Sequence, residues 1–159
     1  MNRYVSSLSA LTILFAAIVA VSCEPEDQEN RDIIESFYLG TLTVEQNDGD
    51  DYIQDSVKIE ILPVDNSVYV RVIMRSVKFS PKMPISLDMT IPLVSCSTDN
   101  ENIYLSGDSI VPLALGGEYP HYIITSMSGK IDNQNYLVLD MKCGAIPLSY
   151  FGQLHSYEQ

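Results

Sequence analysis

Cysteine thiols are the side chains of this 159-residue chain best suited to covalent chemistry, and Cys23 stands in the most informative context. Arg3 precedes an apolar run from Leu8 to Val21, and the small residues Ala20-Val21-Ser22 lead directly into Cys23. This order is typical of a lipoprotein signal peptide that is cut before the cysteine. The thiol would then carry a diacylglycerol and the freed amine a further acyl chain, which hold a protein durably on a membrane. We expect residues 1–22 to be removed and Cys23 to be a lipid anchor; the alternatives are an ordinary signal peptide and an uncleaved anchor.

The residues after Cys23 predict a solvated, acidic tether over 23–36. Glu24-Pro-Glu-Asp-Gln-Glu is polar, negatively charged and interrupted by proline, which disfavours a packed structure. It resembles the acidic export signal that follows the lipid cysteine in surface lipoproteins of Bacteroidetes, and the alternative is a plain spacer. Residues 31–37 would allow a short helical turn at the end of the tether.

The other two cysteines, Cys96 and Cys143, have two interpretations. In a protein outside the cytoplasm they would pair as a disulfide, which would stabilise the fold by about 4 kcal/mol. Alternatively, they are two buried, unreactive thiols. Their spacing does not suit a metal site, and neither has a histidine near it in the sequence.

The remaining titratable side chains form no recognisable catalytic motif. His121 and His155 are the only histidines, and neither lies in a pattern with a nucleophilic serine or cysteine. Asp48-Gly49-Asp50-Asp51 concentrates oxygen ligands, but its spacing is not that of a calcium loop and also suits an ordinary turn. We therefore expect no enzyme activity, no metal and no cofactor. A hydrolase built on two carboxylates is the last alternative.

Tyrosine is frequent in this chain, which has ten tyrosines and no tryptophan. Exposed tyrosines near the mouth of a barrel would stack on sugars or contact a protein partner. The alternative is that tyrosine is simply favoured in β-strands. The second half of the chain holds Tyr104, Tyr119, Tyr122, Tyr136, Tyr150 and Tyr157.

The charge of the chain narrows the classes of partner. Nine basic and 21 acidic residues give a net charge of −12, and loss of Arg3 with the signal peptide makes it more negative. This charge disfavours nucleic acid and attraction to anionic lipid, so we expect membrane contact through acyl chains on Cys23 alone. The length that remains after cleavage suits one domain.

Beyond the tether, the pattern is one of short strands separated by turn residues, with no long amphipathic helix. Many short strands joined by hairpins predict a sandwich or a closed antiparallel barrel. Eight strands would close around an interior wide enough for side chains or one small ligand. The expected strands are about 37–45, 55–62, 67–75, 77–80, 85–95, 102–106, 109–115, 121–131, 135–143 and 148–155.

Two hairpins supply the predicted barrel interior. In the first, a turn at 63–66 pairs Ile61 with Val68, which puts one apolar set on a single face. In the second, a three-residue loop at 133–135 pairs Ile131 with Leu137, and Asn135 suits the left-handed conformation that such loops need. The predicted interior residues are Val57, Ile59, Ile61, Val68, Val70, Val72, Met127, Leu137, Leu139 and Met141. Alternation also places Cys143 on the apolar face, whereas Cys96 faces inward only if Pro92 introduces a bulge.

Three short motifs suggest a family. Phe37-Tyr38-Leu39-Gly40-Thr41-Leu42-Thr43-Val44 opens the domain, Val77-Lys78-Phe79 follows the first hairpin, and Phe151-Gly152 lies near the end. With the cysteine motif, this order resembles the calycin-like β-barrel lipoproteins of Bacteroidetes over residues 37–155. The resemblance implies a single eight-stranded, up-and-down, lipocalin-like barrel held on the outer membrane. True lipocalins carry Gly-x-Trp in the first strand, and this chain has no tryptophan, so no ligand chemistry or catalytic residue is carried over.

These observations favour a non-enzymatic binding protein of the cell envelope. It would hold a small apolar or amphipathic ligand in the barrel, or an envelope protein at a loop end. The alternative is a structural or interaction subunit of a cell-surface complex, with a solid core and a functional surface.

Overall fold

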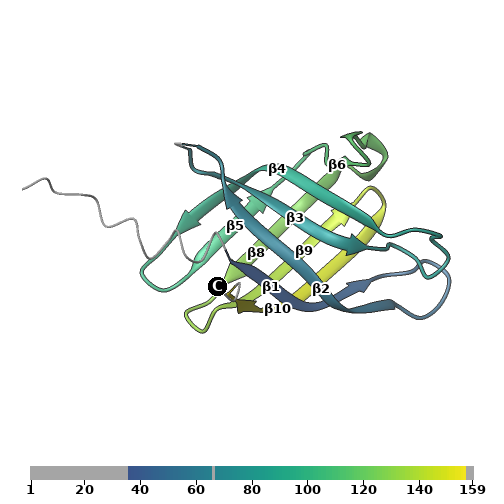
Figure 1. The fold of residues 1–159 in the computed structure, drawn as a ribbon, viewed down its shortest axis with the longest axis horizontal. Coiled ribbons are helices and arrows are strands. Elements are labelled where there is room, and N and C mark those ends of the chain that lie inside the picture. Colours follow the sequence, from purple (N-terminus) through teal and green to yellow (C-terminus); the bar gives the residue numbers. More distant parts are fainter. Residues whose placement is uncertain (1–35, 66, 157–159) are drawn as a thin grey trace, which may run out of the picture.

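The computed structural model describes residues 36–65 and 67–156, which form a closed, eight-stranded antiparallel β-barrel (Figure 1). This confirms the all-β fold that the strand pattern predicts and the lipocalin-like barrel that the resemblance implies. The strands are β1 (Phe37–Val44), β2 (Tyr52–Pro63), β3 (Tyr69–Val77), β4 (Leu87–Thr98), β5 (Ile103–Gly107), β6 (Leu113–Ala114), β7 (Gly117–Glu118), β8 (Ile124–Ile131), β9 (Tyr136–Cys143) and β10 (Ile146–His155).

The barrel wall follows the order β3-β2-β1-β10-β9-β8-β5-β4, and a β3–β4 pairing closes the ring. The β6–β7 hairpin attaches to β4, and the 3₁₀ turn η1 (Pro120–Tyr122) follows it before β8. No separate strand forms at 77–80, because Val77 is the last residue of β3 and residues 78–80 begin the β3–β4 connection. The strand expected at 109–115 is wrong for a physical reason, because Pro112 and the glycines at 116–117 turn the chain after two paired residues.

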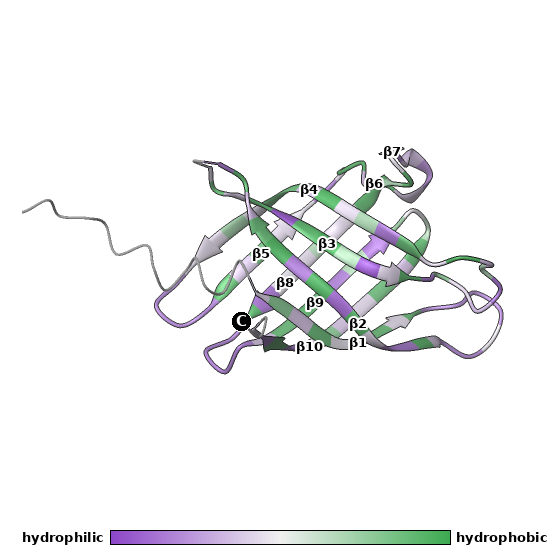
Figure 2. Ribbon diagram, viewed as in Figure 1, coloured by the Kyte–Doolittle hydropathy of each residue, from purple (hydrophilic) through white to green (hydrophobic). Residues whose placement is uncertain are grey.

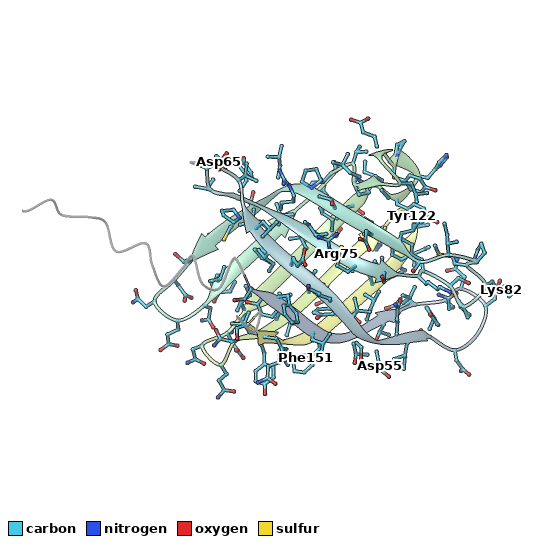
Figure 3. All side chains as sticks on the ribbon, viewed as in Figure 1. Asp55, Asp65, Arg75, Lys82, Tyr122 and Phe151 are labelled. Carbon is cyan, nitrogen blue, oxygen red and sulfur yellow. The ribbon has the colours of Figure 1, made fainter. Side chains whose placement is uncertain are left out.

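Antiparallel pairing gives the barrel two unlike ends (Figure 1). We call one the turn end: β1 begins there, and three short connections close it at 64–68, 99–102 and 132–135. We call the other the loop end, with longer segments at 45–51, 78–86 and 108–123 and the tight turn at 144–145. Figure 3 places Asp65 at the turn end and Lys82 and Tyr122 at the loop end.

The core fills the barrel with one face of every wall strand. Hydrophobic and hydrophilic residues alternate along the strands (Figure 2), and the inward set is almost fully buried. Nine of the ten predicted interior residues lie there: Val57, Ile59, Ile61, Val70, Val72, Met127, Leu137, Leu139 and Met141. Val68 does not, because its side chain is 70% exposed in the turn before β3.

The first hairpin differs from its predicted register by four residues, since Ile61 pairs with Val72 rather than Val68. Strand β2 runs on to Pro63, and a five-residue turn follows, in which Val64 N–H donates to the Tyr69 carbonyl at 3.1 Å. The longer turn moves the pairing along β3. Because the shift is an even number of residues, the same faces of β2 and β3 still point inward.

The second hairpin has the predicted register near its turn. Ile131 pairs with Leu137, Gly129 pairs with Leu139, and Asn135 adopts φ 63°. The expected pairing of Met127 with Met141 is displaced, because the ladder is irregular between Thr125 and Ser128. Ser126 has φ 52° in that bulge, and Asp108 accepts its backbone N–H at 2.9 Å.

Two of the three motifs that suggested the family, at 37–44 and 151–152, meet in the β1–β10 strand pair. Gly40 of β1 lies opposite Gly152 of β10, and a Cβ at either position would collide with backbone or with the Tyr150 ring. The Tyr150 ring therefore lies over Gly152, and its hydroxyl donates to the Val57 carbonyl at 3.1 Å. This arrangement ties β10 to β2 across β1 inside the barrel.

Candidate functional site

The predicted lipid anchor, Cys23, the tether and the signal peptide lie outside the described residues. In the described residues, no helix has both the length and the apolar character needed to cross a membrane. Both observations leave the anchor as an expectation from the sequence.

The barrel interior is packed with large apolar side chains. Leu42, Ile59, Met74, Ile91 and Leu137 have no exposed surface at all. A space large enough for a water molecule beside such a side chain would leave part of its surface exposed. Among the described residues, these levels of the barrel are therefore solid.

Two buried tyrosines cross this interior with different hydrogen bonding. Tyr150 donates to Val57, but no described residue lies within hydrogen-bond distance of the Tyr38 hydroxyl. Burial raises the pKa of both phenols above the usual range, and the nearby Asp132 carboxylate adds to the effect on Tyr38. Both groups are neutral packing elements rather than acids or bases at physiological pH.

The structure does not bring Cys96 and Cys143 together, so the disulfide expectation is corrected to two free thiols. The thiol of Cys143 lies 3.9 Å from the sulfur of Met89, which precedes Cys96 by seven residues on β4. Extended strand over that distance spans roughly 20 Å, whereas a disulfide needs Cα atoms about 4.4–6.8 Å apart. Leu93, at φ 55°, forms the bulge after Pro92, and Cys96 accordingly packs against the core.

Neither cysteine is activated for nucleophilic chemistry. Burial raises the pKa of Cys143 to about 12 and also raises the pKa of Cys96. His121 is exposed in η1, and His155 stacks on Phe37 with ring centroids 5.7 Å apart at the turn end. Within the described ranges, no three His, Cys, Asp or Glu side chains are placed to hold a metal, and this includes residues 48–51.

The outer wall over β2, β3 and β4 carries charges that neutralise one another. Glu60 binds Lys58 at 3.0 Å and Arg75 at 2.7 Å, and Arg75 also reaches Asp88 at 3.0 Å. The backbone N–H of Ser76 lowers the pKa of Asp88, and the hydrogen bond from Arg75 contributes. This strip supports the wall and leaves little net charge for a ligand.

The tip of the β6–β7 hairpin combines exposure with backbone strain. Its two central residues, Leu115 and Gly116, have φ values of 51° and 85°, which is a type I′ turn. Asparagine and glycine suit such positions, whereas leucine in the left-handed region costs about 1 kcal/mol. Leu115 is nevertheless 66% exposed. The hairpin thus holds an apolar side chain out in solvent at a cost in stability.

An aromatic ladder, formed by Phe79, Tyr122 and Tyr119, lies at the same end. Phe79 is buried and contacts Tyr122 at a centroid distance of 5.1 Å. Tyr122 in turn stacks on the partly buried Tyr119 at 5.3 Å, with only 6° between the ring planes. The ladder therefore leads from the core to the surface. Tyr157 of the predicted tyrosine cluster lies outside the described residues; among the other five, only Tyr119 and Tyr122 are stacked on each other.

Backbone and side-chain contacts join the segments of the loop end. Gln46 donates to the Phe79 carbonyl at 3.1 Å, and Gly144 N–H donates to the Ile123 carbonyl at 2.9 Å. A Cβ at Gly144, whose φ is 61°, would lie 2.5 Å from the His121 oxygen. The loop end is thus one connected surface rather than four independent loops.

A second aromatic pair lies on the outer wall. Phe151 of β10 is 56% exposed and stacks on Tyr136 of β9 at 5.4 Å. Figure 3 shows Phe151 on the outside of the barrel. The stacked rings cover one face of each other.

Comparison of the chain with protein-family models, with curated proteins and with solved structures found no match. The fold defines the chain as a closed eight-stranded antiparallel β-barrel.

Proposed function

We propose that this chain is a non-enzymatic, envelope-anchored binding protein that recognises its ligand or partner with the loop end of a solid barrel. The observation that carries the proposal is the β6–β7 tip, where Leu115 is exposed in a strained conformation. Strain and exposed apolar surface both lower stability, and a contact with another molecule would explain why Leu115 combines them. Leu93 has a similar φ of 55° and is 57% exposed, but it lies in a bulge within the barrel wall, whereas Leu115 projects from a hairpin tip.

The solid interior supports recognition at the surface rather than inside the barrel. Side chains such as Ile59, Val72 and Leu139 leave no space for a guest in the described structure. Of the two functions that the sequence suggests, this favours the protein with a solid core and a functional surface. A small apolar guest inside the barrel would require these side chains to move apart.

The position of the chain start supports an outward-facing loop end. The tether joins the barrel at Ser36, beside Phe37 at the turn end. With acyl chains on Cys23, the turn end would face the membrane and the loop end would face away from it. We propose an outer-membrane lipoprotein of the calycin-like group of Bacteroidetes, in keeping with the motifs at 37–44 and 151–152.

The anchor is tested with Cys23→Ala in the native organism. Loss of the lipidated cysteine should release the protein from the outer-membrane fraction or leave it unprocessed. A variant that still fractionates with the outer membrane would contradict the anchor.

The recognition surface is tested by photo-crosslinking on intact cells. A diazirine side chain, which inserts into neighbouring C–H and O–H bonds, replaces Leu115 in one variant. In the matched control it replaces Val68, which is equally exposed but lies at the turn end. We expect a defined adduct from position 115 and none from position 68. Equal labelling at both positions, or none at position 115, would contradict recognition at the loop end.

A further inference from the structure

The aromatic ladder gives the loop end a surface with a specific chemistry. Tyr122 has Tyr119 on one side and Phe79 on another, and no ring among the described residues contacts the second face of Tyr119. The hydroxyl of Tyr119 also makes no hydrogen bond to a described residue. The ladder therefore ends in a partly exposed tyrosine whose hydroxyl is available for a hydrogen bond.

This face is held rigidly before any ligand arrives. Tyr119 N–H donates to the Pro112 carbonyl at 2.8 Å, and Tyr122 N–H donates to the Tyr119 carbonyl at 3.0 Å. Pro120 restricts the backbone at the start of η1. A fixed aromatic platform loses little conformational freedom on binding, which favours affinity for a small or flexible ligand.

The charge of the chain limits the classes of ligand that this aromatic face can bind. The net charge of −12 opposes nucleotides and other anions, although their rings would also stack on tyrosine. Near the ladder, however, both signs of charge occur in the sequence, with Glu118 beside Tyr119 and Lys78 beside Phe79. Such a mixture of acceptors and donors does not select a cation. It suits hydroxyl groups, each of which both donates and accepts a hydrogen bond.

We infer that the loop end binds a neutral carbohydrate, with the apolar C–H face of one pyranose ring stacked on Tyr119. Leu115 would contact the neighbouring apolar face or linkage, since the β6–β7 hairpin leads directly into Tyr119. This inference rests on the proposed function, because it names the ligand class of the same surface.

Isothermal titration calorimetry of the mature protein in detergent tests the inference. The probes are maltohexaose, cellohexaose, laminarihexaose, mannohexaose and xylohexaose, with hexagalacturonate as the anionic counterpart. We expect at least one neutral hexaose to bind and hexagalacturonate to bind at least about tenfold more weakly. Binding of none of the neutral hexaoses, or a preference for hexagalacturonate, overturns the inference.

Variants locate the contact. Tyr119→Ala and Tyr119→Leu both remove the ring and should raise the dissociation constant about tenfold or more. Tyr119→Phe keeps the ring and should change the dissociation constant by no more than about twofold. Tyr119→Leu preserves bulk if the alanine variant is unstable. Tyr104→Ala is the matched control, since Tyr104 is an exposed tyrosine at the turn end. Unchanged binding in Tyr119→Leu overturns the inference. If crosslinking at position 115 persists while all neutral hexaoses fail, only the ligand class is wrong and recognition at the loop end stands.

Discussion

The two ends of the barrel join neighbouring strands with different kinds of connection. At the turn end, aspartates accept the free backbone N–H groups of short turns: Asp99 binds those of Glu101 and Asn102, and Asp132 those of Gln134 and Tyr136. At the loop end, longer segments hold a strained Leu115 and an open aromatic face. The turn-end contacts stabilise the barrel, whereas under the proposed function the exposed Leu115 and the aromatic face of the loop end contact another molecule.

Disrupting the tight turn that supports the loop end should produce the largest effect. Gly144→Ala places a Cβ 2.5 Å from the His121 oxygen and forces alanine to φ 61°. We expect a loss of about 2–3 kcal/mol in the free energy of unfolding, measured by urea denaturation. Hydrogen exchange should quicken mainly over residues 119–124. Uniform quickening across both ends would show that the loop end is not a separate unit.

Removing a cap at the turn end should lower stability without touching recognition. Asp132→Ala leaves the N–H groups of Gln134 and Tyr136 without their carboxylate, and we expect a loss of about 1–2 kcal/mol. Binding to any loop-end ligand should remain unchanged in calorimetry. Weaker binding in this variant would mean that the two ends are coupled.

Relieving the backbone strain at the tip of the β6–β7 hairpin should raise the free energy of unfolding rather than lower it. Leu115→Asn puts a residue favoured in type I′ turns at φ 51°, so we expect about 0.5–1 kcal/mol more stability and weaker recognition. The matched substitution Val68→Asn, at the turn end, should change neither quantity appreciably. If Leu115→Asn lowers stability instead, the leucine is part of the packing and not a contact residue.

Lowering the pH should reduce the stability of the fold more through Asp99 at the turn end than through Asp108 at the loop end. The N–H groups of Glu101 and Asn102, with the Tyr104 hydroxyl, lower the pKa of Asp99 from 3.8 to about 2. A folded-state pKa below the unfolded value means that this stabilisation is present above about pH 4 and is lost as the pH falls toward 2. The N–H of Ser126 also lowers the pKa of Asp108 at the loop end. In urea midpoints measured from pH 6 to 2, Asp99→Asn should flatten the acid decline more than Asp108→Asn does.

The strand pattern predicts an all-β fold and most of its interior, because alternation is unbroken along β9 and holds from Val57 to Ile61 in the sequence of β2. It leaves a sandwich and a closed barrel open, and the choice of the barrel rests on the family resemblance. It failed at Val68, because alternation does not reveal where a strand ends and its turn begins. It also failed at 109–115, where a two-residue strand is too short to leave a periodic pattern.

The loop-end surface could be predicted only in part. Tyrosine frequency indicates six tyrosines in the second half of the chain and does not single out Tyr119 and Tyr122. Their ladder includes Phe79 from a distant loop, a contact that no local pattern encodes. Leu115 had one signal, because leucine before two glycines is an unusual choice for a tight hairpin. The distance in space between Cys96 and Cys143 depends on the strand register, so it could not be derived from the number of residues between them in the sequence.

Recognition at the loop end over a solid interior is tested most directly by methyl NMR of the mature protein, titrated with dodecanoate and with the neutral hexaose that binds. We predict that dodecanoate moves no methyl resonance of Val72, Leu137 or Met141. The hexaose should move those of Leu113 and Leu115. If either ligand instead causes saturable shifts of the interior methyl resonances and leaves Leu115 unchanged, the solid barrel is contradicted and the ligand binds inside the barrel.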